Sequence, residues 1–169
     1  NFSITSEIVS SLQAIAQLDR KYIIAYSNDA DVLVALDQHA VDERIRLDAL
    51  YRDLSKNGES HVFGVAFLHP LDWGNELTKQ EVDVAYRHKK TLNEYGFGFE
   101  IVGDSFNVYS VPTIYHHVVD DVGHFKKWLA QLEQTNAGLR PPFVHYYFCA
   151  IACRYAIMFN DQLTLEECQ

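Results

Sequence analysis

An apolar run at residues 32–36 ends in Asp37, Gln38 and His39, and the chain then has the periodicity of a helix to about residue 54. An uninterrupted run of this length is typical of a strand that is buried on both faces. Polar side chains that follow such a strand at the start of a helix mark a usual place for a site in α/β proteins. This junction therefore constrains both the fold and the position of any chemistry.

His39 and Glu43 are four residues apart, so in a helix their side chains lie one turn apart on the same face. An imidazole nitrogen and a carboxylate oxygen that converge in this way suit a divalent metal ion. Asp37 is placed to bind a second ion or to activate a water. A structural interpretation stands beside this one, because an Asp at such a junction often caps the helix and a His/Glu pair is often a surface pair.

The length of 169 residues allows one domain, or one domain with a large insertion. A hydrophobic content of 48% excludes a disordered chain. No stretch of about eighteen apolar residues and no signal peptide is present, so we expect no membrane association. The first residue is Asn1 and not Met, as expected for a piece of a longer chain. The odd cysteine count, Cys149, Cys153 and Cys168, indicates a reducing intracellular compartment.

The formal charge of −9 limits how this chain can act on nucleic acid. Proteins that bind DNA unaided carry a basic surface, because neutralising phosphates supplies most of the affinity. The chain has only 14 Lys and Arg residues and no long basic run. If the chain acts on DNA, other segments or a partner must supply the positive surface.

The first part of the chain predicts a small antiparallel sheet followed by a helix. Residues 2–18 form a partly helical lead-in, and strands at 21–26 and 32–37 pair as a hairpin. The helix at 40–54 has the spacing to bury Val41, Ile45 and Ala49.

The middle of the chain predicts a second group of elements. Thr78 and Glu81 form a capping box for a helix that ends at Gly96, and Pro112 ends the last strand of a following hairpin. We expect an inserted α+β unit at 63–135 and a discontinuous subdomain made of 1–62 and 136–169. The predicted fold class is α+β (mixed α/β), with a small sheet and packed helices.

The last part of the chain predicts the most apolar helix, residues 143–159, which should be buried nearly all round. Arg154 is unusual in so apolar a segment and would need a polar partner. The pattern from Thr164 to Glu167 is a capping box for a further helix, so we expect the chain to continue beyond Gln169.

Asp37-Gln38-His39-Ala40 followed by Glu43 resembles the signature of the C-terminal domain of endonuclease-competent MutL proteins. In that signature a second Glu stands where this chain has Asp48, which keeps the charge on a shorter side chain. By helix angle Asp48 points about half a turn away from His39, so we expect it to be structural.

A second motif, Ala152-Cys153-Arg154, resembles the Ala-Cys-[Arg/His] element of the same family. The residues at 43–47 and 156–168 are most similar to the MutL homologue 3 branch, with the post-meiotic-segregation branch next. The resemblance covers essentially the whole chain and makes the inserted unit similar to the family's regulatory subdomain. It implies a metal-dependent DNA-nicking domain of mismatch repair or meiotic crossover formation.

Carried over to this sequence, the resemblance implies that His39 and Glu43 are metal ligands and that Asp37 is a catalytic ligand for Mn²⁺ or Mg²⁺. Cys153 would complete a regulatory zinc (Zn²⁺) site. A further Cys-x-His-Gly-Arg element of the family is absent before Gln169. The expected partners are MutL homologue 1, in a heterodimer, and double-stranded DNA, and the expected location is the nucleus.

Two alternatives remain open at this point. The domain could serve dimerisation alone, through an apolar helix and an unpaired strand edge. The three cysteines could instead form a purely structural zinc site with His39 and Glu43. The remaining histidines have no ligand-like spacing to one another and are expected to be surface or packing residues: His61, His69, His88, His116, His117, His124 and His145.

Overall fold

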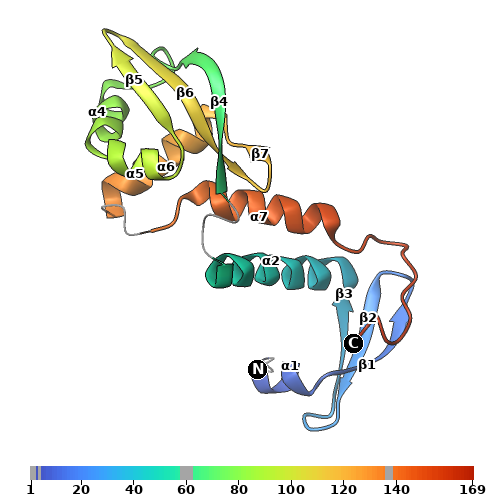
Figure 1. Cartoon of the computed structure of the whole chain (residues 1–169). Helices are drawn as coiled ribbons and strands as arrows, with labels where there is room; N and C mark the ends of the chain where they lie inside the picture. The colour runs from blue at the N-terminus through green and yellow to red at the C-terminus, as the bar shows by residue number, and fades with distance from the viewer. Residues whose placement is uncertain (1–2, 4, 58–62, 136–138) are drawn as a thin grey trace. The chain divides into compact units, whose positions relative to one another are not determined.

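The computed structural model describes residue 3 and residues 5–57, 63–135 and 139–169. They form two compact units, Asn1–Ala49 with Ala150–Gln169 and Leu50–Cys149. Both units combine helices with antiparallel strands, which confirms the α+β fold class (Figure 1). The insertion expected at 63–135 lies wholly within the second unit, which is wider because it also takes in parts of two long helices.

The first unit contains a three-stranded antiparallel sheet in the order β1-β2-β3, with β1 at Gln13–Leu18, β2 at Tyr22–Ser27 and β3 at Val32–Asp37. The hairpin expected between the second and third strands is confirmed. Asp19 and Arg20, both with φ near +50°, join β1 to β2 as a type I′ turn does.

The lead-in to this sheet is helical only over α1, Ser6–Ser11. Ile8, Leu12 and Ile15 have the apolar spacing of a helix, but Ile15 lies in β1. Pairing with β2 satisfies the backbone groups of this segment, which outweighs a short apolar periodicity.

No described residues of the first unit cover one face of its sheet. The prediction that β3 is buried on both faces was wrong, since Leu33 is 63% exposed while Val32 and Val34 are half-buried. An antiparallel sheet needs cover on only one side, so alternate residues face outward. Strand pairing places the outward apolar residues on one surface, here called the outer sheet face: Ala16, Leu18, Tyr22, Ile24, Tyr26, Leu33 and Ala35.

Helix α2 runs from Gln38 to Asn57, longer at both ends than expected. Among its described residues Gln38 and Leu54 are buried, whereas Ile45 is 56% exposed and Ala49 is also exposed. The predicted burial of Ile45 and Ala49 was therefore wrong, because helical spacing fixes which residues share a face but not which faces are covered.

The second unit has a sheet in the order β4-β6-β5, with the short β7, His117–Val118, paired to β6. The strands are β4 at Phe63–Asp72, β5 at Gly98–Val102 and β6 at Ser105–Ile114. Three helices lie on one side of this sheet (Figure 1), α4 at Lys79–Arg87, α5 at Lys89–Glu94 and α6 at Val122–Thr135. The core between them is aromatic: Trp73, Phe97, Phe99, Phe106, Phe125 and Trp128.

Two predictions for this unit need correction, although the Thr78–Glu81 capping box is confirmed. The single helix expected to end at Gly96 is two helices, broken at His88 with φ −103° and ψ 17°. Pro112 does not end β6. The Pro112 carbonyl accepts a hydrogen bond from Val119 N at 2.9 Å, on the side of β6 that faces away from β4. In an antiparallel strand the N–H of a residue points to the same side as its carbonyl, so pairing with β4 does not need the N–H that proline lacks.

Helix α7 begins at Pro142, a position where the absent N–H of proline costs nothing, and ends at Tyr155. It is not buried all round, because Phe143 and Phe148 are buried while Tyr146 and Arg154 are exposed. Since Arg154 faces solvent, it does not require a buried polar partner. No helix in the described part of the chain is long and apolar enough to cross a membrane.

Candidate metal centre

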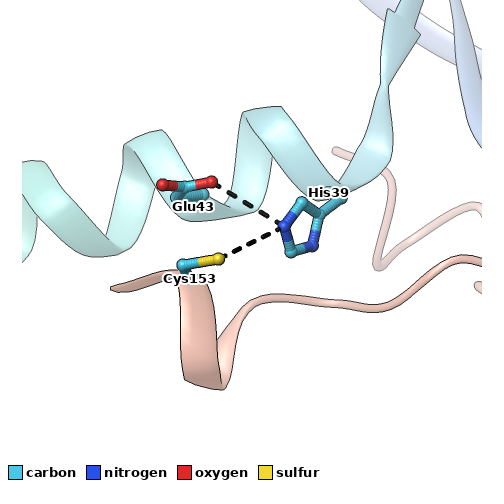
Figure 2. Close-up of side chains that lie close together, drawn as sticks. All are labelled: His39, Glu43 and Cys153. Carbon is cyan, nitrogen blue, oxygen red and sulfur yellow. Dashed lines mark hydrogen bonds and ion pairs between the residues drawn. The ribbon is translucent and has the colours of Figure 1, made fainter. Parts of the chain in front are cut away.

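Three side chains of the first unit converge at one point. His39 lies on the first turn of α2, Glu43 one turn later, and Cys153 on the last turn of α7 (Figure 2). His39 Nε2 is 3.7 Å from Glu43 Oε2 and 3.8 Å from Cys153 Sγ. One ligand atom from each residue lies within 4.8 Å of the others, and this is the one such group among the described residues.

The orientation of His39 is fixed by the backbone of Ile157. His39 Nδ1 is 2.9 Å from the carbonyl oxygen of Ile157. A carbonyl can only accept, so Nδ1 carries the proton and donates it. The lone pair of Nε2 is therefore available on the side of the ring that faces Glu43 and Cys153, as metal-binding histidines require.

The spacing of these atoms fits a tetrahedral zinc ion. Ligand distances of about 2.0–2.3 Å place two tetrahedral ligands about 3.3–3.7 Å apart. The observed 3.7 and 3.8 Å separations need only a small contraction to reach that range. Imidazole, carboxylate and thiolate are all zinc ligands, and three of them leave the fourth position open.

Asp37 lies at the end of β3 but outside this group. Its Oδ1 accepts from Ala40 N at 3.0 Å, which is the contact of a helix cap. Asp37 therefore caps the helix, as the structural interpretation expected, through its Oδ1 atom. The cap does not use Oδ2. The role of Asp37 as a catalytic ligand stays a prediction.

The other two motif residues singled out in the sequence do not join the group. Asp48 pairs with Arg44, both carboxylate oxygens lying 3.1 Å from Arg44 Nε in an exposed ion pair. Arg154 follows Cys153 directly and is exposed.

Gln38 has a structural role that the sequence did not reveal. Its side chain is fully buried, accepts from Gln17 Nε2 at 2.7 Å and donates to the Met158 carbonyl at 2.8 Å. Gln17 in turn bonds to backbone groups of Asp161 and Leu163. Two glutamines therefore join β1 and the start of α2 to the irregular segment that follows α7.

Replacing Gln38 by Ala is expected to lower the free energy of unfolding by about 2–3 kcal/mol, because buried partners lose their hydrogen bonds. Gln80, which is exposed and makes one bond to Glu133, is the matched control, and Q80A should change stability by less than about 0.5 kcal/mol. Urea unfolding of the two variants measures both values. Equal stability of Q38A and wild type would contradict this role.

The remaining cysteines lie apart from the centre, so the alternative of one zinc site built from all three is wrong for the described residues. Cys149 Sγ lies 3.5 Å from His145 Nε2, and His145 Nδ1 lies 2.8 Å from the Tyr51 hydroxyl. The four-residue spacing of His145 and Cys149 was visible in the sequence and was overlooked. At Cys168, burial and the neighbouring Glu167 carboxylate raise the thiol pKa, which disfavours the thiolate.

Comparison with known proteins assigns the chain to a family. Residues 15–163 match the family described as the MutL C terminal dimerisation domain. The chain belongs to the MutL family. Dimerisation with a protein partner is thus a property of the domain type, and the uncovered outer sheet face is compatible with it.

Several DNA mismatch repair proteins are similar over nearly the whole chain. The MLH3 protein of Saccharomyces cerevisiae is 25% identical over 99% of the chain, and human Mlh3 is 26% identical over 98%. Arabidopsis thaliana MLH3 is 27% identical over 98%. The chain spans 28% of the yeast relative and 14% of the human one, so it corresponds to one part of these longer proteins.

Proposed function

We propose that this MutL domain is a metal-dependent DNA-nicking endonuclease domain, acting in a nuclear heterodimer with a MutL homologue 1 partner. The convergence of His39, Glu43 and Cys153 carries the proposal. The mismatch repair names of its relatives support a role in repair. The resemblance of residues 43–47 and 156–168 to the MutL homologue 3 branch is the ground for including meiotic crossover formation.

The reaction is hydrolysis of a phosphodiester bond. A bound divalent ion would polarise a phosphoryl oxygen and give a nucleophilic water near neutral pH. His39 and Glu43 would be ligands of a metal ion, and with Cys153 they would form a zinc site with a regulatory role. Asp37 would be a catalytic ligand of Mn²⁺ or Mg²⁺ through the carboxylate oxygen that its helix cap does not use.

DNA itself is held largely by other parts of the assembly. The domain has a formal charge of −9, so its own electrostatic field repels a polyanion. We expect the rest of the full-length protein, or its partner, to supply the cationic surface.

A second candidate function is dimerisation without catalysis. Two observations favour it, the exposed apolar side chains of the outer sheet face and the cap formed by Asp37. Dimerisation is compatible with nicking, so the two functions differ only in whether the metal centre is used.

Nicking of supercoiled plasmid in Mn²⁺ by the full-length protein, bound to its partner, tests the proposal. Asp37→Asn should lower the nicking rate about a hundredfold, the cost typical of losing one electrostatic contact to a reacting group. Asp48→Asn, a matched change on the same stretch at a carboxylate that pairs with Arg44 and lies outside the metal centre, should leave the rate unchanged.

Equal nicking by Asp37→Asn and wild type would reject the proposed catalytic role of Asp37. No nicking by wild type, with the dimer intact, would reject the endonuclease and favour the dimerisation module.

A further inference from the structure

Both backbone groups of Ile157 are held by side chains from α2. Its carbonyl accepts from His39 Nδ1 at 2.9 Å, and its amide donates to Asp42 Oδ2 at 2.8 Å. His39 and Asp42 are three residues apart, so they lie on neighbouring positions of one helical face. A single residue is therefore fixed at two points by α2.

Ile157 lies just past the end of α7, where its amide no longer takes part in the helix. In the turn just before Ile157, the Ala156 amide donates a hydrogen bond to the Cys153 carbonyl at 3.3 Å. The Asp42 carboxylate is thus the group that satisfies the Ile157 amide. Only 17% of the Asp42 side chain is exposed, and the same Oδ2 also binds Arg46 Nε.

We infer that Asp42 is a positioning residue for the metal centre. Asp42 fixes Ile157, and Ile157 fixes the tautomer and ring plane of His39. The same bond also holds the chain four residues after Cys153, so it restrains the thiol relative to the imidazole. The inference rests on the proposed metal site and assigns Asp42 no contact with the metal.

A simpler interpretation of Asp42 is an ion pair with Arg46, four residues along the helix. That pair alone would stabilise the helix slightly and would not affect metal geometry. The two roles are separable, because Arg46→Ala removes the ion pair and keeps the bond to Ile157. Asp83→Ala removes a similar pair with Arg87 in α4, in the second unit, and serves as the matched control.

Metal affinity and spectroscopy of the full-length protein test the inference. Zn²⁺ affinity is measured by competition with a chelator, and Co²⁺ replaces zinc to report thiolate ligation and tetrahedral geometry by absorption. Asp42→Ala should weaken zinc binding about 10–100-fold and reduce the tetrahedral cobalt bands at metal saturation. Asp42→Asn keeps an oxygen that accepts from Ile157 N, so it should retain the wild-type spectrum.

Arg46→Ala and Asp83→Ala should match wild type in both measurements. Equal weakening by Asp42→Ala and Arg46→Ala would overturn the inference in favour of the ion pair. Wild-type affinity and spectrum in Asp42→Ala would also overturn it. If His39→Ala and wild type bind cobalt alike, the metal site itself fails and the inference fails with it.

Discussion

Replacing His39 by alanine is expected to lower the affinity of the full-length protein for Zn²⁺ by about a thousandfold. His39 Nε2 lies between the other two donors, 3.7 Å from Glu43 Oε2 and 3.8 Å from Cys153 Sγ. Structural zinc binding is worth about 10–16 kcal/mol in total, so one of three or four ligands contributes about 4 kcal/mol. That loss corresponds to about three powers of ten in affinity.

Chelator competition followed by metal analysis measures this loss. His88→Ala is the matched control, because His88 is also half-buried but lies in the second unit, at the break between α4 and α5. Cys153→Ser should weaken binding as well, because a neutral hydroxyl is a poorer zinc ligand than a thiolate. Zinc binding of wild-type strength in H39A would exclude the three-residue centre.

Replacing Leu33 by arginine is expected to weaken dimer formation by about a thousandfold. Leu33 is 63% exposed on the outer sheet face, where it lies opposite Tyr26 of β2. If a partner covers this face, the substitution buries a charge without a counterion, which costs about 3–5 kcal/mol. The free protein loses little stability, since the side chain is mostly in solvent there.

Sedimentation of the full-length protein with its partner measures the dissociation constant. Leu139→Arg makes the same change at a leucine that is 60% exposed in the second unit, and it should leave the dimer intact. Equal dimerisation of L33R and wild type would place the partner on another surface. Equal weakening by L33R and L139R would point to a general effect of the added charge.

The strand–helix junction could be predicted because its determinants are local. The β3 strand, the start of α2 and the spacing of His39 and Glu43 all follow from residues adjacent in sequence. The helix break at His88 and the passage of β6 through Pro112 could not be predicted in this way. The path of β6 through Pro112 depends on which neighbouring strand takes up the backbone hydrogen bonds.

The burial of apolar faces was the least predictable feature. Ile45 and Leu33 have the periodicity of core residues and are exposed. Periodicity shows that a face is apolar, but another element, or another protein, must cover that face before it is buried. In a dimerisation domain such exposed faces are expected.

By itself the sequence determined the chemical identity of the site. It supplied a histidine and a glutamate one helical turn apart, and a family motif that pointed to Cys153, more than a hundred residues away. Only the tertiary structure decided that these donors meet, that Asp37 caps α2, and that Asp42 holds Ile157 against His39. The reason is that a turn of helix fixes neighbours three or four residues apart, whereas contacts between α2 and the end of α7 depend on packing of the whole unit.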